Sequence, residues 1–253
     1  MKITLLGTGT SQGVPVIACE CPVCLSNDSK DDRLRSSLLI ETGGFNFVID
    51  TGPDFRQQML REKVKKIDAI LFTHEHKDHI AGLDDIRSYN WIYKKPTDIY
   101  AEERVLKALQ IEYSYVFAED KYPGIPEMTL HEIENKSFEI HGIPITPIRG
   151  MHHKLPVFGF RFGNMAYLTD INSIPEEEYE KLHNLEILIV NALRKRPHIS
   201  HFNLEEALGF IKKVNPKKAY LTHISHYMGF HSEVNKELPT NVELAYDGLK
   251  IEI

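Results

Sequence analysis

Long apolar runs are absent from this sequence. A membrane-spanning helix needs roughly 18 or more consecutive apolar residues, and the apolar stretch in residues 1–6 is too short for a secretory signal peptide. Hydrophobic residues make up 42% and charged residues 26% of the 253 positions, a balance typical of a folded globular chain. We therefore expect a cytoplasmic protein without a membrane span, folded as a single domain over residues 1–253.

An excess of positive charge is missing as well. The formal net charge is −6, whereas proteins that bind long nucleic acids rely on basic surfaces to release counterions from phosphates. A long RNA or DNA partner is therefore disfavoured, and a small molecule remains the expected partner. A homodimer is compatible with the sequence, which carries no signal for the oligomeric state.

Cysteines are few, and all three lie close together at Cys19, Cys21 and Cys24. An odd number within one short segment does not suit a disulfide framework. Three thiolates and one imidazole form a common closed zinc site, so the segment predicts a structural zinc loop near residues 19–24 that needs a fourth ligand from elsewhere. Three free thiols are the alternative.

Short β-branched or apolar runs alternate with stretches of helical spacing, which predicts a layered α/β protein. The expected strands are residues 3–6, 37–41, 45–50, 69–72, 144–148, 159–162, 165–168, 187–190 and 219–221, and the expected helices are 53–63, 105–112, 175–182 and 204–214. Asn203 is positioned to cap the last helix, and Asn172 or Ser173 the helix near Pro175. Residues 113–128 predict a long loop or a short insertion.

The most specific pattern is the segment His74-Glu-His76-Lys-Asp78-His79, which follows an apolar strand. Neutral imidazoles and carboxylates are ligands for zinc, iron or manganese. In an extended turn His74 and His76 point the same way, whereas the adjacent Asp78 and His79 diverge enough to serve a second ion. The pattern predicts a two-metal site; the alternative is a solvated turn that happens to be rich in histidine.

This pattern and its setting resemble the metallo-β-lactamase superfamily, in which a strand ends at an aspartate, a later strand leads into His-x-His-x-Asp-His, and further His and Asp ligands follow. The matching positions in this chain are Asp50, His152, Asp170 and His223. The resemblance implies an αββα sandwich with metals at one edge of the two sheets. It also implies that Asp50 supports the ligand loop from behind instead of binding metal.

The resemblance further implies two active-site divalent ions, zinc or manganese, with iron as another candidate. The implied ligands are His74, His76 and His152 for the first ion and Asp78, His79 and His223 for the second, with Asp170 bridging them. His153 is the alternative to His152, which the family's ligand-x-Lys-Leu pattern favours.

Within the superfamily the cysteine segment is similar to the phosphoribosyl cyclic phosphate phosphodiesterase group of the carbon–phosphorus lyase pathway. In that group a structural zinc ties the N-terminal loop to a late histidine. The corresponding fourth ligand here is His226, three residues after His223, and His231 is the alternative.

A catalytic histidine on the substrate side is also implied by the resemblance, and His201 matches it. We assign catalysis to His201 and to the ligand Asp78, whereas His131, His141, His183 and His198 have no comparable context and are expected to be structural. A hydroxide held between two metal ions would attack phosphorus in a small cyclic or nucleotide-like phosphodiester. His201 would protonate the leaving alkoxide or stabilise charge in the transition state.

Other activities remain open because one ligand frame supports several chemistries. The alternatives are an ester, lactone or thioester hydrolase, an iron-dependent oxidoreductase, and a non-catalytic metal-binding protein of a pathway.

Two further features have ordinary explanations. Gly7, Gly9 and Gly13 do not have the spacing of a dinucleotide fingerprint and predict a turn, and Arg87 is expected to stabilise the ligand loop more than to bind a substrate anion.

Overall fold

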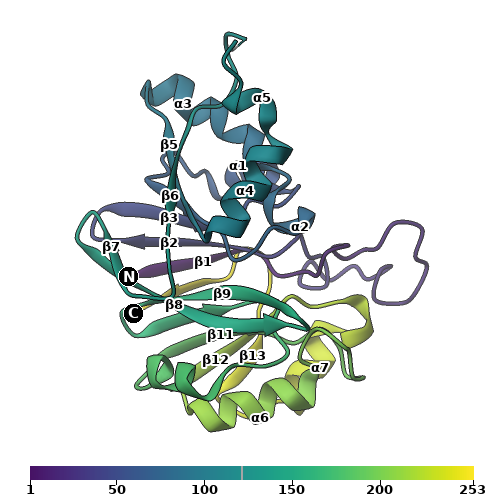
Figure 1. Cartoon of the computed structure of the whole chain (residues 1–253). Helices are drawn as coiled ribbons and strands as arrows, with labels where there is room; N and C mark the ends of the chain where they lie inside the picture. Colours follow the sequence, from purple (N-terminus) through teal and green to yellow (C-terminus); the bar gives the residue numbers. More distant parts are fainter. Residues whose placement is uncertain (121) are drawn as a thin grey trace.

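Two mixed β-sheets stack face to face in the computed structural model, which describes residues 1–120 and 122–253 (Figure 1). The first sheet contains, in spatial order, β14 (Lys250–Glu252), β1 (Lys2–Gly7), β2 (Ser37–Thr42), β3 (Phe45–Ile49), β4 (Ala69–Leu71), β5 (Thr97–Ala101) and β6 (Met128–Glu132). The second contains β13 (Val242–Leu244), β12 (Lys218–Thr222), β11 (Ile187–Asn191), β10 (Met165–Leu168), β9 (Leu155–Phe162), β8 (Ile143–His152) and β7 (Phe138–Ile140).

Helices cover the outer faces of both sheets. The first sheet carries α1 (Phe55–Glu62), α3 (Arg87–Tyr93), α4 (Glu103–Glu112) and α5 (Ser114–Phe117), and the second carries α6 (Leu204–Val214) and α7 (His231–Glu237) (Figure 1). The short α2 (Lys77–Ile80) follows β4 at the edge where the two sheets meet. The predicted αββα sandwich is confirmed.

Alternation along the strands fills the layers of this sandwich. In β10, Met165 and Tyr167 belong to the core between the sheets, whereas Ala166 and Leu168 belong to the core that includes Phe210 of α6. This is the two-residue period of a strand buried on both faces. The strand ends are thereby held rigidly, which matters for the side chains placed there.

The start of α6 is fixed by its cap. The Asn203 side chain accepts a hydrogen bond from the Glu206 amide at 2.9 Å, and the Glu206 carboxylate accepts one from the Asn203 amide at 2.9 Å. This reciprocal pair is a capping box. The cap predicted at Asn203 is confirmed, and it fixes the backbone two residues after His201.

The helix predicted over residues 175–182 is instead a 3₁₀ helix, Glu176–Leu182, and no side chain caps it. Asn172 has a different role: its side-chain oxygen accepts from the His153 amide at 2.9 Å, and its amide nitrogen donates to the Ile199 carbonyl at 3.0 Å. The expected cap is wrong because this amide is used to join two loops.

The long loop predicted over residues 113–128 is also partly wrong. It begins with Tyr113 and the helix α5, whose Val116 is buried together with Tyr113 in the core beneath α4, and it ends in β6. Residue 121 of this segment lies outside the described residues. The strands β5, β6, β7, β13 and β14 and the helices α2, α3 and α7 were not predicted; most are short, and β6 is a half-exposed edge strand without an apolar pattern.

Within residues 1–120 and 122–253, none of the helices has the length and apolar character required to cross a bilayer.

Candidate metal centre

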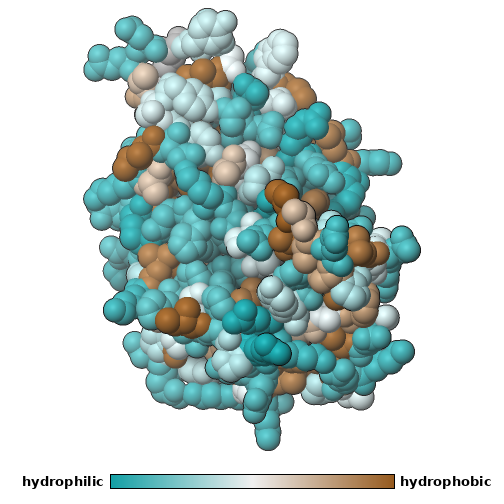
Figure 2. Space-filling model, turned by 90° about the vertical axis from the view of Figure 1, so that its right-hand side faces the viewer, coloured by the Kyte–Doolittle hydropathy of each residue, from teal (hydrophilic) through white to brown (hydrophobic). Residues whose placement is uncertain are grey.

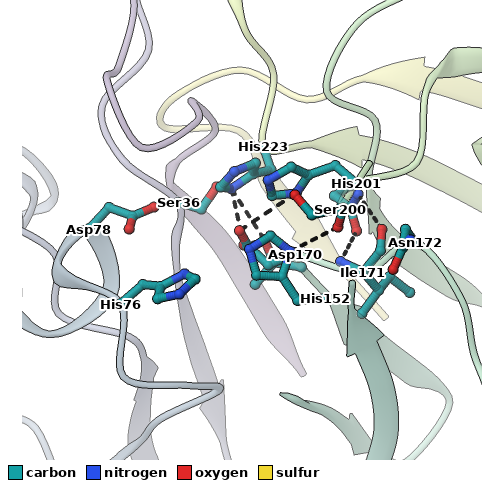
Figure 3. A network of polar contacts seen from close by, with 12 residues as sticks. Ser36, His76, Asp78, His152, Asp170, Ile171, Asn172, Ser200, His201 and His223 are labelled. Carbon is teal, nitrogen blue, oxygen red and sulfur yellow. Dashed lines mark hydrogen bonds and ion pairs between the residues drawn. The ribbon is translucent and has the colours of Figure 1, made fainter. Parts of the chain in front are cut away.

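Three strand ends converge at one edge of the two sheets. Asp50 follows β3, Asp170 follows β10 and His223 follows β12, with φ angles of 62°, 58° and 54°. Residues with a side chain seldom adopt this left-handed conformation, and such positions collect at functional sites. The loop after β4 brings His74 and its neighbouring polar residues to the same edge. Figure 3 shows side chains from both halves of the sandwich pointing into one space.

The first cluster contains His74, His76 and His152, each with one ring nitrogen within 4.8 Å of the others. The His74 Nε2 lies 3.0 Å from the His76 Nδ1. The His152 Nδ1 lies 2.8 Å from the Ser200 carbonyl oxygen, to which it can only donate, so its Nε2 is left with a lone pair. The His153 side chain is exposed. The structure therefore brings His152, and not His153, to this cluster.

The second cluster centres on His79. Its Nε2 lies 3.2 Å from a carboxylate oxygen of Asp78 and 3.2 Å from one of Asp170, without hydrogen-bond geometry to either. Its Nδ1 lies 2.7 Å from the Asp50 carboxylate, which also accepts bonds from the Thr73 amide and hydroxyl at 2.9 and 2.8 Å. Asp50 thus fixes the His79 ring from behind and leaves the opposite nitrogen facing Asp78 and Asp170.

Asp170 lies between the two clusters. The oxygen that faces His79 is also 3.1 Å from the His223 Nδ1, and its second oxygen lies 3.7 Å from the His201 Nδ1. The His201 ring is 4.5 Å from the His152 ring and 4.8 Å from the His223 ring. The structure therefore places His201 directly beside the predicted ligands (Figure 3).

The charges in this edge are unbalanced without a cation. Burial alone would lower the pKa of His79, but the carboxylates of Asp170, Asp78 and Asp50 raise it well above its usual value. Burial lowers the pKa of His74 well below normal, and burial followed by the charge of His223 lowers the pKa of His201 to about 3. The three carboxylates thus favour a positive charge at this position, which a metal ion can supply.

Unpartnered buried atoms support the same conclusion. The Nε2 atoms of His79 and His223 and the Nδ1 of His201 are buried without a hydrogen-bond partner among the described residues. Such atoms are uncommon in folded proteins because each loses hydration without compensation. Coordination of a divalent cation would satisfy the lone pairs of His79 and His223, so the donor set fits the predicted metals, and the His201 Nδ1 is left facing the same space.

The cysteine cluster is a separate group of four side chains. The His226 Nδ1 lies 3.3 Å from each Sγ of Cys19, Cys21 and Cys24. A zinc ion with tetrahedral sulfur and nitrogen ligands would separate them by roughly 3.5 Å. The alternative ligand His231 lies elsewhere, and its two ring nitrogens contact the Arg33 guanidinium and the Asn235 side chain.

The thiols of Cys21 and Cys24 have pKa values shifted in opposite directions. Burial raises the pKa of Cys21, but hydrogen bonds from the Cys24 amide and His226 outweigh this effect and lower it to about 6. Burial, with the neighbouring thiols, raises the pKa of Cys24 to about 11. Three adjacent thiolates therefore need a cation, and zinc supplies that charge.

Close backbone contact holds the His-rich loop in place. A Cβ on Gly52 would lie 2.1 Å from the Asp78 carbonyl oxygen, so only glycine allows the loop after β3 to touch the loop after β4. The Thr51 amide also donates to the His79 carbonyl at 2.7 Å. These contacts join Asp50 and the ligand loop into one unit.

Several other residues have surroundings that differ from those predicted from the sequence. Arg87 is half exposed and pairs with Asp84 at 3.3 Å, away from the clusters. His198, which we expected to be structural, has its ring 5.2 Å from the His201 ring. Ser36 was missed: its hydroxyl lies 3.3 Å from the His223 Nδ1, but a serine before a predicted strand gives no functional signal.

The face of the molecule toward which the N-terminal loop projects is largely hydrophilic, with hydrophobic side chains grouped mainly to the right of centre (Figure 2). Ile17 and Leu25, on the segment that carries the cysteines, are 91% and 63% exposed. The cysteine loop therefore carries exposed apolar side chains on a largely hydrophilic face.

Comparison with solved structures gives a match over the whole chain. A crystal structure described as a new diphosphatase from the PhnP family superposes with a TM-score of 0.93 at 42% sequence identity, covering 100% of this chain and 96% of the other. Zinc-bound PqqB from Methylobacterium extorquens gives a TM-score of 0.79 at 17% identity, covering 100% of both chains, and supports the fold alone.

Sequence comparison identifies the family. An octanoyltransferase of Porphyromonas gingivalis is 41% identical over 253 residues, which are 99% of this chain and 51% of that protein. This chain spans about half the length of the curated relatives it matches. Residues 45–224 match the beta-lactamase superfamily domain. This match includes every predicted ligand of the His and Asp clusters, and the chain belongs to the beta-lactamase superfamily.

Proposed function

We propose that this protein is a metal-dependent hydrolase of a small cyclic or nucleotide-like phosphodiester. The superfamily and the diphosphatase neighbour support a metal-dependent hydrolase. The observation that carries the proposal is the convergence of His74, His79 and Asp170 with further ligands at one buried edge, with His201 beside them.

The metals would be held by two ligand groups. His74, His76 and His152 would bind one ion and Asp78, His79 and His223 the other, with Asp170 shared between them. Bound divalent ions of this kind supply Lewis acidity and an activated water for hydrolysis. Two such ions carry four positive charges, against two from the carboxylates of Asp78 and Asp170, so the loaded site would attract an anion.

The chain's own groups orient these ligands. Asp50 keeps a proton on the Nδ1 of His79, and the Ser200 carbonyl does the same for His152, so each imidazole presents a fixed nitrogen to the site. With its pKa at about 3, His201 is neutral near pH 7 and would donate a hydrogen bond to a phosphoryl oxygen; it would give a proton to the leaving-group oxygen only where a bound phosphoryl anion raises that pKa. One ring nitrogen of His201 lies within 4.8 Å of donor atoms of His152 and Asp170, so these three side chains could also hold an ion; the proposal follows the resemblance in assigning His201 to the substrate.

The substrate class follows from charge and size. A net charge of −6 favours a small-molecule substrate over a nucleic acid chain. The neighbour described as a diphosphatase acts on phosphorus, which favours a phosphoryl centre here too. In a phosphodiester, and in a diphosphate substituted at both ends, each phosphoryl group carries one negative charge. The test therefore includes both substrate classes.

An acyl ester or thioester hydrolase is the second candidate. The relative named octanoyltransferase, at 41% identity, favours it. This chain covers only 51% of that protein, however, and the named activity belongs to the whole. An acyl substrate would also lack the phosphoryl oxygens that His201 is proposed to contact.

The decisive experiment measures turnover by metal-replete protein on a panel of substrates. The panel contains a ribose cyclic phosphate, bis(p-nitrophenyl) phosphate, a nucleoside diphosphate ester, a lactone and an octanoyl thioester, with Asp170→Asn as the inactive control. We expect metal-dependent hydrolysis of the phosphorus substrates only. Turnover of the thioester or lactone alone would refute the proposal and establish the second candidate, and iron as the sole bound metal would favour an oxidoreductase.

A further inference from the structure

The first turn of α4 contacts both halves of the predicted first metal site. Arg104 donates from one guanidinium nitrogen to a carboxylate oxygen of Glu75 and from the other to the Pro156 carbonyl oxygen at 2.6 Å. Glu75 lies between His74 and His76 in the ligand loop, and Pro156 is the second residue of β9. One guanidinium therefore joins the ligand loop of the first sheet to the β8–β9 hairpin of the second.

The hairpin is the segment that carries His152. His152 is the last residue of β8 and pairs with Leu155, directly before Pro156. The first metal site thus requires two histidines from one sheet and one from the other, and Arg104 spans these same two pieces. A shift between the loop and the hairpin would change the distance from His152 to the other two ligands.

A second ion pair fixes the same helix end to β8. Glu102, which precedes α4, accepts two hydrogen bonds from Arg149 at 3.1 and 2.5 Å. The Arg149 guanidinium lies 4.0 Å above the Phe158 ring in β9. This bidentate and stacked geometry restricts the start of α4 relative to the hairpin. Because the start of α4 is held in place, Arg104 can orient Glu75.

Glu75 has little else to hold it. Its second carboxylate oxygen is buried and has no hydrogen-bond partner among the described residues, so Arg104 supplies the principal contact of this carboxylate. The pair is only partly exposed, at 33% and 24%, so solvent weakens it less than it weakens a surface ion pair.

We infer that Arg104 is a positioning residue that sets the geometry of the first metal site through Glu75 and the β8–β9 hairpin. This inference rests on the proposed metal centre. Loss of an outer contact to a metal ligand typically weakens metal binding by about 10- to 100-fold. The second site, whose ligands do not include His76 or His152, should be affected less.

The test is a titration of metal-free protein with Co²⁺, followed by absorption and by competition with a chelator. Arg104→Met and Glu75→Gln should each weaken one active-site ion by about 10- to 100-fold, and Arg104→Lys should restore part of the affinity. The matched control is Lys107→Met, because Lys107 lies on the same helix and, within residues 1–120 and 122–253, pairs only with the exposed Glu103 at 2.6 Å. It should bind Co²⁺ like the unaltered protein.

Two readouts separate positioning from general stability. The thiolate-to-cobalt absorption of the cysteine site should not change, although loss of the partly buried pair should lower the melting temperature of each metal-free variant below that of Lys107→Met. Unchanged affinity, or equal weakening of all sites with a lower melting temperature, would overturn the inference alone. Failure of the unaltered protein to bind Co²⁺ at the histidines would instead overturn the proposed function. Glu75→Gln removes the same ion pair with little change of shape if Arg104→Met does not fold.

Discussion

The His/Asp centre and the cysteine cluster are separated in the chain by only two residues, between His223 and His226, yet they are built differently. The first collects side chains from four segments, and His74, His79, Asp170 and His223 are all buried. The second takes three ligands from one loop, of which Cys19 and Cys21 are half-buried. The His/Asp centre therefore depends on the whole fold, whereas the cysteine cluster depends on one loop and one histidine that is distant in the sequence.

The two clusters also differ in how their ligands are held. The remaining ring nitrogens of His79 and His152 face Asp50 and the Ser200 carbonyl, so outer groups orient these ligands. Besides the His226 imidazole, two of the cysteine sulfurs contact backbone amides of their own loop: Cys24 accepts from the Val16 amide at 3.4 Å and Cys21 from the Cys24 amide at 3.5 Å. A four-ligand cysteine and histidine set is closed to substrate, whereas oriented ligands around a shared carboxylate are typical of reactive sites. We therefore predict a catalytic role for the His/Asp centre and a stabilising role for the cysteine cluster.

The largest effect should follow from removing the shared carboxylate. Asp170→Asn removes the charge that lies within 3.2 Å of His79 and 3.1 Å of His223, so both metal groups lose a ligand. Loss of an outer contact to a ligand typically weakens metal binding by about 10- to 100-fold. Loss of a predicted ligand should cost more, so we expect turnover to fall by more than about 100-fold together with the active-site metal content. Elemental analysis and kinetics measure both.

Asp98→Asn is the matched control, because Asp98 also pairs with a histidine, His131, at 2.7 Å but lies in β5. It should keep its metals and its turnover. The contrast between the clusters fails if Asp170→Asn retains the active-site metals, or if it loses the cysteine-bound zinc to the same extent.

His201→Ala should reduce turnover while leaving all metals bound. Loss of a general acid typically costs about 10²- to 10⁴-fold in rate. The deficit should be large for diesters with poor alkoxide leaving groups and small for p-nitrophenolate, which needs little protonation. Rates across a series of leaving groups, with metal content measured in parallel, test this. Loss of metal would make His201 a ligand, and an equal deficit for all leaving groups would leave only charge stabilisation.

Asp50→Asn tests whether the orientation of ligands by outer groups distinguishes the His/Asp centre from the cysteine cluster. The carboxylate contacts the His79 Nδ1 at 2.7 Å and no predicted ligand other than this one in the described chain. We expect active-site metal affinity to fall by about 10- to 100-fold, with the cysteine site unchanged. Chelator competition measures both affinities in one protein. Equal affinity in the variant would show that the outer carboxylate is not needed to orient His79.

Much of the fold could be predicted because its central strands are apolar on both faces. The strand Met165–Leu168 and the helix Leu204–Val214 have the predicted bounds. Strands such as Thr97–Ala101 and Val242–Leu244 were missed because polar residues interrupt them or because they are only a few residues long. That residues 1–253 form a single domain stays a prediction.

The candidate site could be predicted only in part from local pattern. The His-x-His-x-Asp-His segment is recognisable by itself, whereas Asp170 and His223 gain their meaning from the resemblance and from the meeting of strand ends. Ser36 and Arg104 carry no sequence signal, because their roles arise from contacts to segments far away in the chain. Whether the assembled residues bind the predicted metals is left to the experiments.

The smallest effect on turnover should come from the cysteine cluster. Cys21→Ser removes one of three sulfurs that surround the His226 Nδ1 at 3.3 Å, and serine is a poor zinc ligand. A closed structural zinc contributes to folding, and each kcal/mol lost lowers the melting temperature of a domain of this size by roughly 2–4 °C.

We therefore expect Cys21→Ser to lose one zinc per chain and at least about 5 °C of melting temperature, while turnover per folded molecule changes less than about twofold because the reacting groups lie in the other cluster. Calorimetry, elemental analysis and active-site titration with the two remaining metals provide the measurements. Ser26→Ala, on the same loop but outside the four ligands, is the control and should keep its zinc. A variant that kept its zinc and melting temperature but lost turnover would make the cysteines catalytic and reverse the roles assigned to the two clusters.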